Sequence, residues 1–222
     1  MRNIAALLVA LAVPSLSFAQ GSDEPVGSII PRAKPATVDR ASKGDAARQV
    51  FDDFAACLLG RRKRPVLDAL ALPSGSAEQN EAFRRLVTSQ CIFSGELHFG
   101  AETFRGSFYT ALVRSKFGRK GASLVAEPAD YAKASSPGVG VPPSPYLVGL
   151  LNFASCVVHK DPENARVAVI ATAGSPKEDA AMAELAKVYD QCVYSDTTLR
   201  FSKGSLVGLL AEAYYREGSA SK

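Results

Sequence analysis

Residues Phe54-Ala55-Ala56-Cys57 and Phe153-Ala154-Ser155-Cys156 carry nearly the same tetrapeptide, 99 residues apart. The pair Gly75-Ser76 recurs as Gly174-Ser175 at the same offset. Two matches at one spacing indicate that the chain contains an internal duplication. We therefore compare the two copies position by position to separate residues that the fold needs from residues that could carry chemistry.

The match extends towards the C-terminal end of each copy. Cys91 has its counterpart in Cys192, and four further positions align without gaps: Phe104, Gly106, Ala111 and Arg114 on Leu206, Gly208, Ala213 and Arg216. Nearly all shared positions are apolar, glycine, helix-capping or cysteine residues, which are residue types that a fold requires. We predict one unit over residues 45–117, a second over residues 146–217 and a short tail over residues 218–222.

Apolar residues recur at helical spacing, so each unit is predicted to be mainly α, with roughly four helices. In the first copy we expect helices over residues 45–59 and 65–72, and in the second over residues 147–158 and 162–171. Asp161 followed by Pro162 is typical of a helix start.

The third helix of each unit has the clearest start. Ser76 precedes Gln79 and Ser175 precedes Glu178 by three residues, the spacing of a capping box. A brief extended piece should follow each second cysteine, at residues 97–99 and 199–201.

The fourth helix of each unit contains a glycine, Gly106 or Gly208, on an otherwise apolar face. Glycine inside a helix costs about 1 kcal/mol relative to alanine. Because both copies keep it, we predict that another backbone passes close to this point.

The run from Leu199 to Arg216 resembles a stretch in uncharacterised exported bacterial proteins. Cys156-Val157-Val158, Asp161-Pro162, Ala165-Arg166 and Gly174-Ser175 are similar to that group as well. The likeness covers most of residues 146–217 and is looser in the first copy. It implies architecture only, because no activity or site residue is known to us for that group.

The segments outside the two units have their own patterns. Residues 1–19 read as a secretory signal peptide: Arg2, an apolar run over residues 4–13, and small residues before a cut at Gln20. The alternative is a retained membrane anchor. We expect a flexible leader over residues 20–44 and a linker rich in proline and glycine over residues 118–145.

The four cysteines are predicted to form disulfides, because the protein is expected to be periplasmic or secreted. Four cysteines allow three pairings, which sequence does not decide. The duplication favours Cys57–Cys91 and Cys156–Cys192, since each unit then has its own bond. No Cys-x-x-Cys and no histidine at ligand spacing supports a metal site, so we expect no metal and no cofactor.

Catalytic motifs are absent from the sequence: there is no Gly-x-Ser-x-Gly, Ser-x-x-Lys or His-Glu-x-x-His. The two histidines, His98 and His159, have no counterpart in the other copy. We expect His98 to face solvent and His159 to bind carbonyl groups at a helix end. Asp52 and Asp53 are expected on a solvated helix face, and Arg114 and Arg216 are expected to complement helix dipoles.

Arg61-Arg62-Lys63-Arg64 is the prominent charge run. It makes the copies unlike, since residues 45–120 hold 12 basic and 8 acidic side chains while residues 145–217 hold 7 and 9. The run is either a solvated loop or an anion-binding patch that could meet lipid phosphates, acidic glycans or an acidic protein. Nucleic acid is a poor target because no aromatic residues interleave for stacking.

Three functional hypotheses follow. The first is a non-enzymatic, exported binding or interaction protein of the cell envelope, not integral to the membrane, with an unidentified partner. The second is an enzyme whose site forms between the units from residues such as His98, His159, Asp161 and Glu212. The third is a carrier of a small apolar ligand, with a pocket lined by Phe83, Phe104 and Leu210.

Overall fold

The computed structural model describes residues 42–87, 89–92, 101–136, 138–193, 199 and 201–221. This part of the chain is all-helical and contains no strand. Its α-helices are α1 (Lys43–Leu70), α2 (Ala77–Leu86), α3 (Ala101–Phe117), α4 (Pro145–Lys160), α5 (Pro162–Ile170), α6 (Pro176–Ala186) and α7 (Lys203–Ala220). Two 3-10 helices, η1 (Ser89–Cys91) and η2 (Tyr189–Gln191), complete it.

Several predictions concern residues outside the described part: the signal peptide at 1–19, the leader up to residue 41 and the extended piece at 97–99. The last leader residues are described, and there Ser42 caps α1, so helix begins earlier than expected. At the other end α7 continues to Ala220, into the predicted tail. Below, the first half means residues 42–117 and the second half residues 145–221.

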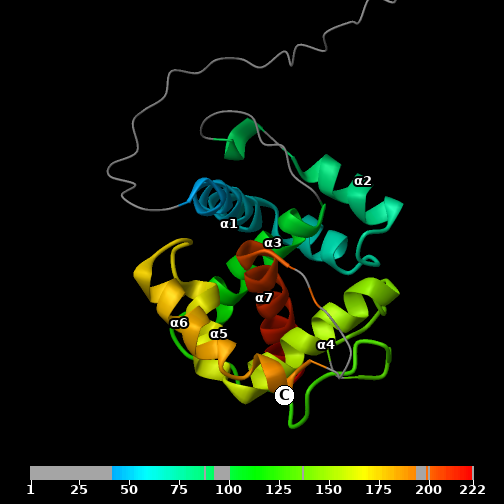
Figure 1. Ribbon diagram of the computed structural model, residues 1–222. Helices are drawn as coiled ribbons and strands as arrows, with labels where there is room; N and C mark the ends of the chain where they lie inside the picture. Colours follow the sequence, from blue (N-terminus) through cyan, green and yellow to red (C-terminus); the bar gives the residue numbers. More distant parts are fainter. Residues whose placement is uncertain are drawn as a thin grey trace, which may run out of the picture.

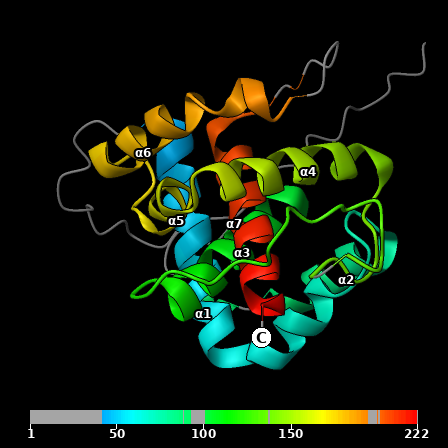
Figure 2. The same cartoon turned by 90° about the horizontal axis from the view of Figure 1, so that it is seen from below.

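Helix α3 and helix α7 lie at the centre of the molecule (Figure 1). Helix α1 packs mainly on α3, and α4 packs mainly on α7, so the two central helices are covered from different sides. The view from below shows α2 and α6 on opposite sides of this central pair (Figure 2). The two halves therefore meet chiefly through α3 and α7.

The two helices expected at residues 45–59 and 65–72 are both present within the span of α1, on either side of a kink. At the kink Arg62 leaves helical geometry, with φ −136° and ψ 45°, and Pro65 follows three residues later. Proline has no N–H to donate to the carbonyl four residues earlier, which interrupts or bends a helix. The prediction of two helical segments is therefore confirmed, with the break at Arg62.

In the second half the corresponding place is a true break between α4 and α5. Asp161 has non-helical geometry, and its side chain accepts a hydrogen bond from the Asn164 backbone N–H at 3.0 Å. Pro162 occupies the first position of α5, where its missing N–H costs nothing. The predicted helix start at Asp161-Pro162 is confirmed.

Both predicted serine caps are confirmed. Ser76 Oγ accepts a hydrogen bond from the Gln79 N–H at 3.1 Å, and Ser175 Oγ accepts one from the Glu178 N–H at 3.2 Å. Each bond satisfies a backbone donor that the first turn of a helix leaves free. Helices α2 and α6 therefore begin where the sequence indicated.

The disulfides Cys57–Cys91 and Cys156–Cys192 are formed, as predicted. They close loops of similar length, with sequence separations of 34 and 36 residues. Each therefore ties its own half, and neither links one half to the other. In the chain-entropy model a loop of this length restricts the unfolded chain by about 3–4 kcal/mol.

The close backbone approach predicted at the two helical glycines is confirmed, and each glycine is the other's neighbour. A Cβ atom added to Gly106 would lie 2.9 Å from the Gly208 Cα, and one added to Gly208 would lie equally close to the Gly106 Cα. No larger residue fits without a shift of backbone. The crossing of α3 and α7 thus requires both glycines.

The larger of two apolar core clusters runs through both halves. In the first half, four phenylalanines pack ring against ring, with centroids 4.5 Å apart for Phe104 and Phe108 and 5.2 Å apart for Phe83 and Phe104. The same cluster continues into α5, α6 and α7 of the second half. Burial of this shared apolar surface is the main force that holds the halves together.

The segment predicted as a linker, residues 118–145, contains no regular element but is packed against the second half. Tyr131 is fully buried, and the N–H groups of Ala129 and Tyr131 donate to Ser155 Oγ at 3.0 Å and to Asn152 Oδ1 at 2.8 Å. The segment is thus fixed along α4, which corrects the expectation of a semi-rigid spacer. Residue 137 lies outside the described part.

Candidate ligand-binding cleft

A cleft of about 160 Å³ opens beside the crossing of α3 and α7. Gly106 and Gly208 belong to its lining, and the other lining residues come from α1, α3, α4, the N-terminal side of α7 and the residues just before it. Because both halves contribute, the cleft exists only when the halves are packed together. A cavity of roughly 150 Å³ holds a benzene ring, which sets the scale of what can enter.

One side of the cleft is apolar. It consists of Leu147, Leu150 and Leu151 from α4 together with Leu209 from α7. Tyr146, in the first turn of α4, also lines the cleft and is 66% exposed, the largest exposure among the big apolar side chains of the described residues. Its ring therefore stands at the solvent-facing edge, where it can cover a bound molecule.

The other side is polar and comes from α1, α3 and α7. Its buried members are Arg48, Asp52, Arg105, Ser107, Thr110 and Glu212. Buried charges are costly unless they are paired and hydrogen-bonded. The pairing of each charge therefore decides what this side offers to a ligand.

Glu212 of α7 lies between two arginines. Its carboxylate accepts hydrogen bonds from Arg105 Nε at 2.9 Å and from Arg105 NH2 at 2.7 Å, and Arg216 Nε lies 2.9 Å away. Burial by itself would raise the pKa of Glu212, but the two guanidinium groups outweigh it and lower that pKa below its ordinary value. Glu212 is thus held as a carboxylate.

Each of the three guanidinium nitrogens of Arg105 donates a hydrogen bond. Besides Glu212 it donates to the Leu70 carbonyl at 3.3 Å and to Tyr109 Oη at 3.4 Å. Burial disfavours its charge, yet the interaction with Glu212 raises its pKa above the ordinary value. The Arg105–Glu212 pair joins α3 to α7 near the glycine crossing.

Asp52 of α1 is the weakest of the paired charges. Its Oδ2 lies 3.1 Å from Arg114 NH2, and Ser107 donates a hydrogen bond to it. Burial nevertheless outweighs these partners and raises the pKa of Asp52 above its ordinary value. The two buried carboxyl groups of the cleft are thus shifted in opposite directions, with the pKa of Asp52 raised and that of Glu212 lowered.

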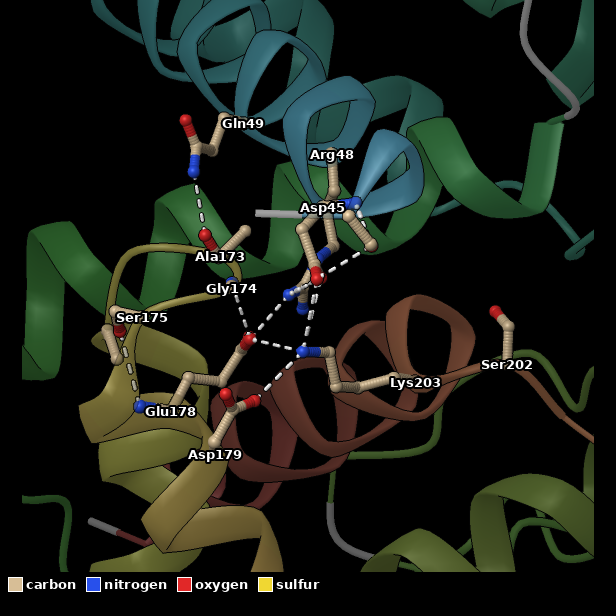
Figure 3. Close-up of polar contacts among 12 residues, drawn as sticks. Asp45, Arg48, Gln49, Ala173, Gly174, Ser175, Glu178, Asp179, Ser202 and Lys203 are labelled. Carbon is tan, nitrogen blue, oxygen red and sulfur yellow. Dashed lines mark hydrogen bonds and ion pairs between the residues drawn. The ribbon is translucent and has the colours of Figure 1, made fainter. Parts of the chain in front are cut away.

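Arg48 connects the cleft to a second charge cluster at the start of α1, α6 and α7 (Figure 3). Its NH2 group lies 2.6 Å from Glu178 Oε2 and 3.0 Å from Asp45 Oδ1. Lys203 Nζ lies 3.2 Å from Asp45, 3.3 Å from Glu178 and 3.0 Å from Asp179. We call Asp45, Arg48, Glu178, Asp179 and Lys203 the junction cluster.

The junction cluster shifts the pKa values of Asp45 and Lys203 in the direction that favours their charges. Burial raises the pKa of Asp45, but hydrogen bonds from Ser42 and Lys203 and the charges of Lys203 and Arg48 bring it below the ordinary value. Burial lowers the pKa of Lys203, but Asp179, Asp45 and Glu178 raise it above the ordinary value. The cluster thus ties the first turn of α1 to the second half.

Of the four residues of the enzyme hypothesis, His98 lies outside the described part. Asp161 caps α5. His159 was expected to bind helix carbonyls, but its Nε2 lies 2.7 Å from Oε2 of the fully buried Glu217. Among the three described residues, Glu212 alone lines the cleft.

The pocket predicted between Phe83, Phe104 and Leu210 is wrong in its lining. All three side chains are at most 2% exposed and fill the core, and none of them lines the cleft. The expectation for Asp52 is also wrong, because it is buried while Asp53 is exposed. Successive helical residues point in different directions, and the face with Asp52 turns towards α3.

Arg114 and Arg216 do more than complement helix ends. Arg216 does not lie in the last turn of α7, and it donates to the carbonyls of Gly138 and Val139. Arg114 is in the last turn of α3, but it donates to the Ala171 carbonyl at 2.8 Å and pairs with Asp52. The helix-dipole interpretation is wrong for Arg216 and incomplete for Arg114.

The basic run lies at the bend of α1. Arg61, Lys63 and Arg64 are exposed there, while the half-buried Arg62 donates to the Arg85 carbonyl at 3.1 Å. None of the four lines the cleft. The sequence therefore located a surface feature and not the cavity.

Arg48, Arg105, Glu178 and Lys203 were missed at the sequence level. One signal was available for Glu178, since its counterpart Gln79 is neutral and a carboxylate at a capping position calls for a reason. Arg105 directly precedes the glycine of the crossing, where a charge needs a partner from the other helix. Arg48 and Lys203 showed no such signal, because exposed helical cations are common.

No side-chain cluster suited to hold a metal ion occurs in the described ranges. Of the helices in those ranges, none is both long and apolar enough to cross a membrane. No family model matches this chain, and it is not similar enough to any curated protein or any solved structure to count as a match.

Proposed function

We propose that this chain is a non-enzymatic, exported binding protein of the cell envelope, and that it holds a small molecule with an apolar body and a polar end in the cleft at the α3–α7 crossing. One observation carries the proposal: leucines and a tyrosine line the cleft together with hydroxyl groups and paired charges. Small-molecule sites have this composition.

The state of the charges favours a ligand without a strong charge of its own. Arg105 forms an ion pair with Glu212, and Asp52 forms one with Arg114. Arg48 is paired with both Asp45 and Glu178. Breaking such a buried pair to bind an ion would cost more than it returns. Ser107 and Thr110 supply hydroxyl groups that can serve a neutral polar group.

The charge state of Glu212 argues against its use as a general base. A general base needs a pKa near the working pH. The pKa of Glu212 is lowered by its two arginines, and both of its oxygens accept hydrogen bonds. Among the residues of the enzyme hypothesis, the one that lines the cleft is therefore better suited to a structural role than to acid–base catalysis.

Duplication of a roughly four-helix unit is part of the proposal. It is supported by the paired disulfides, the paired serine caps and the two glycines that meet at the crossing. Superposing the halves in an experimental structure tests it. Failure of α2 and α3 to fall on α6 and α7 would contradict a common origin.

Export is supported by the two disulfides, which persist in oxidising compartments. Cell fractionation with N-terminal sequencing of the protein tests it. We expect the protein outside the cytoplasm with Gln20 at its N-terminus, and a cytoplasmic protein that keeps Met1 or Arg2 would contradict export.

Binding is tested with benzyl alcohol, which combines one ring with one hydroxyl, followed by amide shifts in NMR titration. We expect shifts at Leu150, Ser107 and Leu209, and weaker shifts with toluene, which lacks the hydroxyl. Tyr146→Ala should weaken binding several-fold, while the control Val141→Ala, at an exposed apolar residue that does not line the cleft, should not. Shifts confined to residues outside the cleft, or no saturation, would refute the proposal.

A further inference from the structure

The bend of α1 and the end of α2 place two groups of cations side by side. The Cys57–Cys91 disulfide ties α1 to η1, which directly follows α2, and the Arg62 guanidinium donates to the Arg85 carbonyl at 3.1 Å. The cations of the bend thereby lie beside those of the last turn of α2. We call this set the cationic surface: Arg61, Arg62, Lys63, Arg64, Arg84 and Arg85.

The cationic surface keeps a net positive charge. Two carboxylates face it: Asp68 lies 3.3 Å from Arg64, and Glu81 pairs with both Arg84 and Arg85 at 2.6 and 2.9 Å. These pairs are exposed, with the arginine side chains 75–88% accessible, so the carboxylates are easily exchanged for other anions in water. Six cations against two carboxylates leave a surplus for a partner.

The cations stand out from a rigid support. On α1 the surface is backed by the buried Val66, and on α2 by the buried Phe83 and Leu86. The disulfide and these contacts fix the two helices relative to each other. Charges at fixed positions meet a partner without losing much backbone freedom.

The corresponding place in the second half is not basic. There Asp161 caps α5, and Glu163 holds Arg166 at 2.5 Å. The cationic surface is thus a property of the first half. It also lies away from α6, on the side of the central helix pair where α2 is found (Figure 2).

The form of the surface indicates what it fits. A single phosphate group is bound by donors that converge on one point. Here Arg64, Arg84 and Arg85 are 75–88% exposed and come from two different helices, which suits a sheet of many anions. Val87, at the end of α2 beside Arg85, is 39% exposed and offers an apolar contact that headgroups of a bilayer could cover.

We propose that the cationic surface docks this protein on a membrane leaflet rich in anionic phospholipid. Attraction acts through several cations at once, and each cation near such a surface adds to the affinity. The binding is peripheral, so it does not require a spanning helix. This proposal is independent of the cleft and of any ligand held there.

The test is co-sedimentation of the purified protein with vesicles of phosphatidylcholine, with and without phosphatidylglycerol. We expect binding that depends on phosphatidylglycerol and falls as salt is added, because salt screens exposed charges. Binding to vesicles of pure phosphatidylcholine measures any contribution to the affinity that does not depend on anionic lipid. The triple variant Arg61→Glu, Arg64→Glu and Arg85→Glu should lower the affinity by at least about a hundredfold.

The matched control changes the same total charge elsewhere. Arg119→Glu, Lys120→Glu and Lys187→Glu alter exposed residues away from the cationic surface and should lower the affinity only a few-fold. Circular dichroism verifies that each variant is folded, and the milder triple change to glutamine replaces any variant that is not. Equal losses in both triple variants would overturn the proposal.

An acidic partner protein is the competing explanation, and a second arm distinguishes it. The same proteins are titrated with poly-glutamate in place of vesicles. Binding to poly-glutamate combined with no binding to phosphatidylglycerol vesicles would overturn membrane docking. Membrane docking would be supported if the wild type and the control variant bind the vesicles and the Arg61→Glu, Arg64→Glu, Arg85→Glu variant does not.

Discussion

The starts of α2 and α6 are built in the same way, yet their third residues do opposite work. At α2, Gln79 donates from Nε2 to the carbonyls of Ala69 and Leu72, both at 3.2 Å. At α6, Glu178 accepts from Arg48 at 2.6 Å and lies 3.3 Å from Lys203. Both side chains are 1% exposed, so each must satisfy its polar atoms inside the protein.

The two starts also share a backbone feature. Gly75 and Gly174 precede the capping serines with φ of +76° and +72°, a region that favours glycine. Their N–H groups donate to Gln79 Oε1 at 3.0 Å and to Glu178 Oε2 at 2.8 Å. The remaining polar atoms of Gln79 and Glu178 then decide whether the helix start bonds only to its own half or also to the other half.

The comparison shows that the third residue of the helix, Gln79 or Glu178, decides which contacts the helix start makes. With an amide, the start of α2 binds carbonyls of its own half, close to the end of α1. With a carboxylate, the start of α6 recruits cations from α1 and α7 and becomes the centre of the junction cluster (Figure 3). The packing of the halves thus depends on a difference between the two helix starts.

The largest expected effect comes from Glu178→Gln. It removes the carboxylate between Arg48 and Lys203 and leaves buried cations short of a partner, which costs about 3–5 kcal/mol. Denaturant unfolding measures the loss. The control Glu184→Gln, whose pair with Lys187 is exposed, should change stability by less than about 0.5 kcal/mol. A loss below about 1 kcal/mol for Glu178→Gln would show that the cluster is not structural.

The reciprocal change, Gln79→Glu, should also destabilise the protein. It places a carboxylate against two carbonyl oxygens and removes their donor, at a cost of about 2–3 kcal/mol at neutral pH. The cost should shrink in acid, because a protonated carboxyl regains a hydrogen to donate. Unfolding at neutral and at acidic pH measures both. Equal losses at the two pH values would contradict the role assigned to the amide.

The α3–α7 crossing should respond equally from either side. Gly106→Ala and Gly208→Ala each press a methyl group against the opposite Cα and should each cost about 1–3 kcal/mol. Gly149→Ala in α4 meets no atom within 4 Å and should stabilise by up to about 1 kcal/mol. Unequal losses at the two crossing glycines would mean that the contact is less symmetric than described.

The smallest effect is the pH dependence of the junction cluster. The pKa of Asp45 is lowered from 3.8, so its contribution to stability is present above that value and is lost as pH falls through the folded-state pKa. The pKa of Lys203 is raised from 10.5, so its contribution is present below that value and is lost as pH rises further.

The difference in unfolding free energy between wild type and Asp45→Asn measures the acid limb. We expect it to be flat from about pH 5 to neutral and to decrease below the ordinary aspartate pKa. Arg85→Gln on α2, which lies far from the cluster, is the control and should give a difference without this acid limb. A difference that grows in acid would contradict the sign of the Asp45 shift.

Local features of the fold were predictable, because they depend on neighbours in the sequence. The serine caps at Ser76 and Ser175 and the helix start at Asp161 need only three or four consecutive residues. The predicted repeat favoured the disulfide pairing that is observed. The interruption of α1 at Arg62 was likewise predictable from the break in the apolar pattern and from Pro65.

The cleft and the charges around it were not predictable in the same way. Arg48 and Glu178 are 130 residues apart, and Arg105 and Glu212 are 107 apart. From sequence alone, a charged residue on a helix is expected to be exposed to solvent unless its partner is known. The residues chosen for a pocket, such as Phe83 and Leu210, were apolar and therefore filled the core.

The sequence by itself determined that the described chain is helical, where most helices begin and where two backbones must touch, and it favoured the cysteine pairing without deciding it. These properties follow from short-range geometry and from the constraint that a missing side chain imposes at Gly106 and Gly208. Tertiary structure alone decided that Glu178 faces Arg48, that Asp52 is buried and that a cleft opens beside the crossing. Those outcomes depend on how the two halves are oriented, and orientation is set by the whole packed surface.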